Sequence, residues 1–201
     1  MRGSSHSGLG GFSLVEMMVT VVVIGILLAA AVPMFSVWIG NSKIRTAAES
    51  VYAGLQVAKQ EAVRRNARVL FRAVDPASTS WQICPVGLGT LVCDPMQPAI
   101  QVRGDEATTV LMGASTDANS TIPGAFGPAI PGGAGMPAVV MFDSMGRTVI
   151  APGLVNAVRF DFRDPRLEAS NNERRLVVTI SPGGSPRMCD PQVPAGNPRS
   201  C

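Results

Sequence analysis

An uninterrupted apolar segment near the N-terminus constrains this chain more than any other feature. Twenty-six consecutive residues without a charge separate Glu16 from Lys43. A helix needs only about 20 apolar residues to cross the roughly 30 Å hydrocarbon core of a membrane. The rest of the 201-residue chain is long enough for one domain, and its net charge of +3 is too small to imply a polyanionic partner. The sequence therefore predicts a membrane-spanning helix followed by a globular domain.

One carboxylate, Glu16, lies at the start of this segment, and neither a secretory signal nor a plain anchor accounts for it. A secretory signal begins with a basic region and ends soon after its apolar stretch. Here Arg2 is the only Lys or Arg before the segment, and the helical pattern continues well beyond it. An unpaired carboxylate in the hydrocarbon region costs about 2.5–3.5 kcal/mol or more. Glu16 is therefore expected to have a cationic partner.

The residues before and after Phe12 resemble the processing site of type IV pilins and of type II secretion pseudopilins. Gly10 and Gly11 precede the sequence Phe-Ser-Leu-Val-Glu, which ends at Glu16. The resemblance implies that residues 1–11 are a leader, that a prepilin peptidase cuts after Gly11, and that the new amine of Phe12 is methylated. It also implies that Glu16 faces the N-terminal amine of a neighbouring subunit during assembly, which fits the requirement of a buried carboxylate for a nearby cation.

Beyond Pro33 the apolar residues become periodic, which indicates that the helix continues along a domain. They recur mostly at steps of three and four: Ile44, Ala48, Val51, Tyr52, Leu55, Ala58, Ala62 and Val63. The charged residues that fall largely between them are expected to form a solvated face: Lys43, Arg45, Glu49, Lys59, Glu61, Arg64 and Arg65. One helix is expected from about residue 12 to residue 66. Pro33 matches a position at which pilin helices bend, since proline removes one helical hydrogen bond.

After residue 66, short β-prone runs alternate with turn residues and predict an all-antiparallel sheet. The runs are residues 68–74, 81–84, 108–113, 138–143, 147–151, 157–162 and 174–181. Residues 143–146 are expected to form a hairpin turn with Gly146 at positive φ, and the Gly- and Pro-rich residues 119–137 a surface loop.

The predicted fold class is α+β and pilin-like, with a long N-terminal α-helix packed on a C-terminal antiparallel β-sheet domain. The first half of the helix is expected to be transmembrane and the second half amphipathic. Residues 12–40 would form the transmembrane or filament-core part. Residues 41–201 would form a periplasmic domain that includes the rest of the helix.

Three further segments resemble the GspH/FimT family of minor pilins and pseudopilins. Residues 142–147 match its F-x-x-x-G-R hairpin, residues 58–66 match an A-x-x-E-A-x-x-R-N pattern, and the final strand with the following PGGSPRMC resembles its C-terminus. The resemblance implies a minor subunit that helps initiate or cap a type IV pilus, with type II secretion pseudopilin H as the alternative. The implied partners are the prepilin peptidase, other minor pilins or pseudopilins, the major pilin, and lipid of the bacterial inner membrane. No motif is recognisable in residues 75–137.

Four cysteines favour disulfide bonds and an oxidising compartment. They are Cys84, Cys93, Cys189 and Cys201, and three pairings are possible. Pairing between neighbours would close loops of about ten residues, each stabilising the fold by roughly 2–3 kcal/mol in the chain-entropy treatment. Metal-binding cysteines are usually more closely spaced, so neither a metal nor a cofactor is predicted. Cysteines near the C-terminus are common in FimT/FimU minor pilins and favour a pilus over a secretion pseudopilus.

The residue types offer little support for catalysis. The only histidine, His6, lies in the expected leader, so imidazole-activated nucleophiles and histidine metal sites are excluded from the processed chain. The carboxylate pairs Asp161 with Asp164 and Asp105 with Glu106 are flanked by arginines and turn residues, and we interpret them as surface charge. The chain is therefore not expected to be an enzyme.

DNA is a further partner implied by the resemblance, because FimT-like pilins bind DNA through a C-terminal G-R-x-R motif. The corresponding residues 184–187 retain only the second arginine, Arg187. Arg174, Arg175 and Arg199 could add phosphate contacts if the fold brings them near it. One phosphate contact gives little affinity, and Arg187 is more simply interpreted as a solvated residue beside a disulfide.

Overall fold

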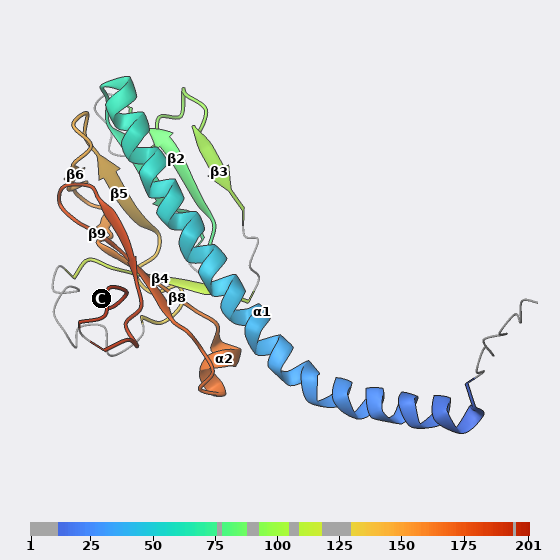
Figure 1. Ribbon diagram of the computed structural model, residues 1–201. Coiled ribbons are helices and arrows are strands. Elements are labelled where there is room, and N and C mark those ends of the chain that lie inside the picture. The colour runs from blue at the N-terminus through green and yellow to red at the C-terminus, as the bar shows by residue number, and fades with distance from the viewer. Residues whose placement is uncertain (1–11, 76–77, 88–92, 105–108, 118–129, 195) are drawn as a thin grey trace, which may run out of the picture. The chain divides into compact units, whose positions relative to one another are not determined.

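The computed structural model describes residues 12–75, 78–87, 93–104, 109–117, 130–194 and 196–201. The chain divides into two compact units, residues 1–38 and residues 39–201. One 52-residue helix, α1 (Leu14–Arg65), forms most of the described part of the first unit and continues into the second (Figure 1). Asn66 then adopts a positive φ of 48°, a conformation that asparagine tolerates and that commonly ends a helix.

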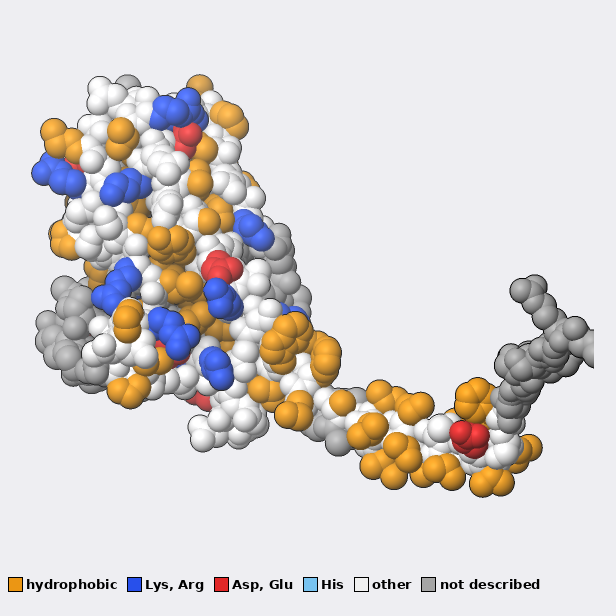
Figure 2. All heavy atoms as spheres, viewed as in Figure 1, with side chains coloured by type: hydrophobic (Ala, Val, Ile, Leu, Met, Phe, Trp, Pro, Cys, Tyr) orange, Lys and Arg blue, Asp and Glu red, His pale blue; other side chains and the backbone are white. Residues whose placement is uncertain are grey.

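Most of the exposed side chains described in the first unit are apolar. Its most apolar 18-residue window has a mean hydropathy of 2.6, and none of that window is buried. Figure 2 shows hydrophobic side chains covering the face of this helix that is in view. The helix is thus long and apolar enough to cross a membrane. The side chain of Pro33 lies outside the described residues, so the bend expected there stays a prediction.

Besides α1, the described residues of the second unit include two β-sheets and one short helix. The first sheet has the order β3 (Gln101–Arg103), β2 (Trp81–Pro85), β1 (Val69–Ala73), β5 (Ala138–Phe142) and β6 (Thr148–Val149), with β7 (Val155–Asn156) also paired to β5. The second sheet has the order β10 (Pro186–Cys189), β9 (Leu176–Ile180), β8 (Arg159–Arg163) and β4 (Leu111–Ser115). Helix α2 (Pro165–Ala169) connects β8 to β9.

The predicted fold class is confirmed, and each of the seven predicted β runs overlaps a strand. The expectation of purely antiparallel pairing is wrong for β7, which pairs with β5 in parallel. A compact turn reverses the chain between β6 and β7. The Asn156 side chain stabilises this turn by accepting a hydrogen bond from Ala151 N at 2.7 Å and donating one to Ala151 O at 2.9 Å.

Helix α1 packs on aromatic side chains that link the two sheets. Phe71 of β1 contacts Trp81 of β2 and Phe160 of β8, with ring centroids 5.4 and 5.9 Å away. Gly54 permits this close approach, because a Cβ there would lie 2.9 Å from carbon atoms of both Phe71 and Trp81. The Trp81 indole also donates to Ser50 Oγ at 3.0 Å.

Most of the predicted apolar face of α1 is fully buried: Ile44, Ala48, Val51, Leu55, Ala58 and Ala62. Val63, however, is 51% exposed, and its predicted place in the core is wrong. Val63 follows the fully buried Ala62 and points about 100° further round the helix, towards solvent.

Candidate functional site

Glu16 lies in the first turn of α1, which Ser13 caps. Ser13 Oγ accepts a hydrogen bond from Glu16 N at 3.2 Å, which is the geometry of an N-cap residue and the third helical residue. A carboxylate in the first turn is also favoured by the helix dipole. Glu16 is the only charged residue between Phe12 and Lys43. Gly11 lies outside the described residues.

The predicted hairpin turn between β5 and β6 is present and is held by Asp143. Its Oδ1 accepts hydrogen bonds from Met145 N at 2.9 Å and Arg147 N at 2.8 Å, and Arg147 Nε lies 3.3 Å from Oδ2. The bond from the Arg147 backbone is the main cause that lowers the pKa of Asp143. Gly146 has φ +74° as predicted, and Phe142 is fully buried. Each residue named in the F-x-x-x-G-R pattern thus has a structural role.

This hairpin meets helix α1 and the β9–β10 turn at one point, which we call the hairpin junction (Lys59, residues 143–148 and residues 181–184). A Cβ on Gly146 would lie 3.0 Å from Lys59 Cε, and a Cβ on Gly184 would lie 1.9 Å from the Gly146 carbonyl oxygen. Thr148 N donates to Pro182 O at 3.1 Å. Lys59 Nζ donates to Gly183 O at 3.3 Å. The junction therefore joins the helix to both sheets.

A second attachment fastens α1 to α2 and the loop after it, and sequence reasoning missed it. A Cβ on Gly40 would lie 2.7 Å from Leu167 Cδ1, so a larger residue there would require the Leu167 side chain to shift. Asn41 Nδ2 donates to Asn172 O at 3.0 Å, and Asn41 Oδ1 accepts from Arg174 N at 2.7 Å. In the sequence, only Gly40 and Asn41 at the end of the apolar run indicated this attachment.

Asp161 is fully buried, and the interpretation of Asp161 and Asp164 as surface charge is wrong. Asp161 Oδ1 lies 3.2 Å from Arg175 Nε, and its Oδ2 lies 3.9 Å from Arg159 Nη2 and accepts from Ile130 N at 3.3 Å. Burial raises the pKa of the Asp161 carboxyl, while the Arg175 guanidinium opposes that rise.

Asp164 is also buried, and it has a local structural role. Its Oδ1 caps α2 by accepting a hydrogen bond from Arg166 N at 3.0 Å. Both carboxylates of this predicted pair are thus engaged in holding the fold. The other predicted pair, Asp105 with Glu106, lies outside the described residues.

The arginines that were predicted as DNA contacts differ in their exposure and in their contacts. Arg175 is 6% exposed and faces Asp161, which contradicts its predicted role as a phosphate contact. Arg187 is exposed, but its Nη2 donates to Ser200 O at 3.0 Å and to Pro198 O at 3.4 Å. Arg174 and Arg199 are exposed. Arg187 therefore helps to hold the C-terminal segment in place.

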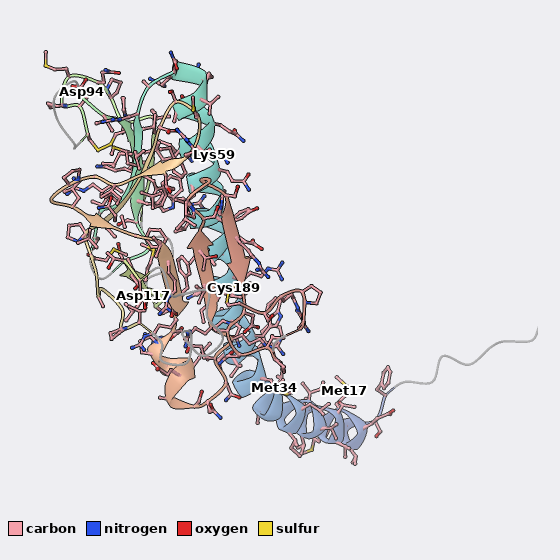
Figure 3. All side chains as sticks on the ribbon, turned by 90° about the vertical axis from the view of Figure 1, so that its left-hand side faces the viewer. Met17, Met34, Lys59, Asp94, Asp117 and Cys189 are labelled. Atoms are coloured by element: carbon pink, nitrogen blue, oxygen red, sulfur yellow. A yellow bond between two sulfur atoms is a disulfide. The ribbon has the colours of Figure 1, made fainter. Side chains whose placement is uncertain are left out.

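Two disulfides connect neighbouring cysteines. Cys84 is bonded to Cys93, and Cys189 of β10 is bonded to Cys201, with Cα–Cα distances of 5.3 and 5.0 Å (Cys189 is labelled in Figure 3). The second bond ties residue 201 to the edge strand of the second sheet. Within the described residues, no group of three or more His, Cys, Asp or Glu side chains is placed to hold a metal ion.

Two family models match the chain. One, described as type II transport protein GspH, matches residues 47–184, and the other, the prokaryotic N-terminal methylation motif, matches residues 10–32. A comparison with curated protein sequences gave no match.

Similar solved structures include two minor subunits. The type IV minor pilin FimU of Pseudomonas aeruginosa is 17% identical, with a TM-score of 0.46 over 75% of this chain and 94% of FimU. The minor pseudopilin EpsH of the Vibrio cholerae type 2 secretion system is 13% identical, with a TM-score of 0.43 over 75% of this chain and 99% of EpsH.

Proposed function

The chain belongs to the GspH family, and from this premise we propose that it is a minor pilin that helps initiate or cap a type IV pilus. The observation that carries the proposal is Glu16, the single charge of α1 before Lys43, whose backbone N–H donates to Ser13 Oγ in the first turn. We propose that prepilin peptidase cuts after Gly11 and methylates Phe12. The Glu16 carboxylate then pairs with the N-terminal amine of a neighbouring subunit.

Assembly would follow from the two properties of this helix. Its apolar side chains can leave the lipid only for an equally apolar surrounding, which a bundle of similar helices provides. The Glu16 carboxylate is costly in that bundle unless a cation compensates it, and a neighbour's amine meets this need. Before assembly, residues 12–40 would span the bacterial inner membrane with residues 41–201 in the periplasm. The two disulfides fit that oxidising compartment.

Replacing Glu16 with alanine is expected to leave leader removal intact and to abolish incorporation into filaments. The substitution keeps the cleavage site but removes the charge that pairs with the neighbour. Immunoblots of membranes would show the mature chain, shorter by the leader, whereas sheared filaments would lack it. Glu49→Ala is the matched control, because Glu49 is an exposed glutamate of the same helix. Normal incorporation of the Glu16 variant would contradict the proposal.

The principal alternative is a pseudopilin that acts in type II protein export, as the description of the matching family model suggests. Deleting the gene separates the two functions. We expect surface pili to be lost while protein export continues, and the reverse phenotype would support the export function. The neighbouring genes provide an independent test, since other minor pilins with a large tip adhesin indicate a pilus, and a secretion ATPase with a secretin indicates export.

DNA uptake is the second alternative, and we expect the globular unit not to bind DNA strongly. Non-specific affinity requires several neutralised phosphates together, and Arg187 already donates to carbonyl groups of its own chain. In a gel shift with residues 39–201, we expect no salt-sensitive complex at micromolar protein. A complex that weakens with salt and is lost in Arg187→Ala would instead support DNA binding.

A further inference from the structure

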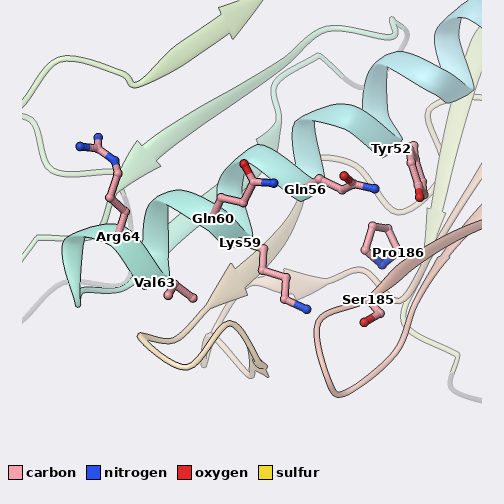
Figure 4. A pocket seen from close by; sticks show the side chains of 8 residues that line it. All are labelled: Tyr52, Gln56, Lys59, Gln60, Val63, Arg64, Ser185 and Pro186. Carbon is pink, nitrogen blue, oxygen red and sulfur yellow. The ribbon is translucent and has the colours of Figure 1, made fainter.

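An open groove of about 590 Å³ runs beside the hairpin junction and has no role in the function proposed above. One wall is a stripe of α1 that includes Gln56, Lys59, Gln60 and Val63, and the other wall is formed by Ser185 and Pro186 (Figure 4). Figure 4 shows Lys59 reaching from the helix towards the turn that carries these two residues. Val63 is 51% exposed here, although it follows a fully buried Ala62.

The groove carries a positive charge that the described residues do not balance. Lys59 Nζ donates to the Gly183 carbonyl, and no described carboxylate lies within ion-pair distance of it. At the end of the stripe, Arg64 lines the groove and lies 2.7 Å from the carboxylate of Glu61. Arg65 shares that carboxylate at 2.8 Å, and neither Glu61 nor Arg65 belongs to the lining of the groove. The hydrogen bonds from the two arginines lower the pKa of Glu61 to about 2, so this carboxylate stays ionised and two guanidinium groups face one negative charge.

The spacing of the amide side chains suits an extended peptide. Gln56 and Gln60 are four helical residues apart, which corresponds to about 6 Å along the helix. In an extended chain, peptide groups that face the same side repeat every two residues, about 6.6 Å apart. Two glutamine amides at this spacing can therefore donate to and accept from alternate peptide groups, while Val63 and Pro186 offer apolar contacts.

We propose that this groove binds an extended acidic segment of a different subunit of the same filament, with Lys59 pairing to an Asp or Glu of that segment. Charge complementarity selects an acidic occupant. The inference rests on the proposed function, since it takes the partner to be a filament subunit. It adds a contact made by the globular unit to the one expected from the membrane helix.

Zero-length carbodiimide coupling tests this contact, because it joins an amine to a carboxylate only where the two are paired. Lys43 and Lys59 are the only lysines of the chain, so a Lys43→Arg variant leaves Lys59 as its one side-chain amine. We would treat sheared filaments that contain this variant and identify coupled peptides by mass spectrometry. The expected product joins Lys59 to an Asp or Glu of another subunit, and Lys59→Arg should remove that product while the chain still enters filaments.

Charge reversal supplies a second readout. Lys59→Glu is expected to reduce the amount of this chain in filaments at least tenfold, whereas Lys59→Arg retains it. Thermal unfolding of both variants would show that the domain remains folded. Normal incorporation of Lys59→Glu would overturn the inference.

The remaining outcomes separate the groove from the filament function. If the chain is present in filaments but Lys59 forms no coupled product, the groove inference fails and the proposed function stands. Coupling between tagged and untagged copies of this chain would also overturn the inference, because the occupant would then be a second copy. If the unmodified chain is absent from filaments, both proposals fail together.

Discussion

Replacing Asp161 with alanine is expected to destabilise the second unit by about 3–5 kcal/mol, since it removes the carboxylate from a buried cluster of ion pairs. Arg159 and Arg175 are 5% and 6% exposed and would both lose the carboxylate between them. Ile130 N would lose its acceptor as well. Urea unfolding of the detergent-solubilised chain, followed by the fluorescence of buried Trp81 in a Trp38→Phe background, measures the loss.

Glu49→Ala provides the matched control for this effect. It removes a carboxylate from an arginine at a similar distance, with Arg45 Nε 2.8 Å from Glu49 Oε1, but both side chains are more than half exposed. Exposed helix pairs of this spacing contribute only about 0.3–0.5 kcal/mol. Equal losses for the two variants would show that burial of Asp161 has no energetic consequence.

Replacing Gly184 with alanine is expected to destabilise the same unit by about 2–4 kcal/mol, through backbone strain and overpacking together. Gly184 has φ +69°, and a Cβ on it would lie 1.9 Å from the Gly146 carbonyl oxygen. Because that oxygen belongs to the backbone, the β9–β10 turn and the β5–β6 hairpin would have to move apart. The same urea titration measures this effect.

Gly153 and Gly183 allow the contribution of backbone strain to be measured apart from that of overpacking. Gly153 also has a positive φ, of 77°, but nothing lies within 4 Å of a Cβ placed on it, so Gly153→Ala tests strain alone. Gly183 has only Ser181 Oγ near, at 3.8 Å, and no positive φ, so Gly183→Ala should have little effect. We expect the losses to rise in the order Gly183, Gly153, Gly184. If the Gly184 variant were no less stable than the Gly153 variant, the β9–β10 turn and the β5–β6 hairpin could move apart without loss of stability.

Helix α1 was predicted correctly because its sequence carries a local period. The helical repeat of α1 extends over many turns, and Ala48, Val51 and Leu55 are buried as that repeat requires. Strands β3, β7 and β10 have only three, two and four residues, too few for an alternating pattern to be recognised. Their positions depend on the strands beside them, which a single sequence does not reveal.

Asp161 illustrates why the interior charge could not be predicted. Strand β8 reads Arg-Phe-Asp-Phe-Arg, and such alternation is typical of a strand with one solvated face. The structure covers that polar face with residues distant in sequence. Ile130 donates its N–H to Asp161, and Arg175 approaches from the residue before β9. Only the tertiary fold brings these groups together.

The attachment at Asn41 has a consequence for how the sequence can vary. Its amide contacts the carbonyl of residue 172 and the N–H of residue 174, both of which are backbone groups. The side chains at those two positions are therefore not specified by the contact, and almost any residue that permits the same loop geometry preserves it. A search for pairs of positions that change together in evolution would therefore not detect this attachment. It nevertheless fixes the part of α1 around Asn41, near the start of the second unit.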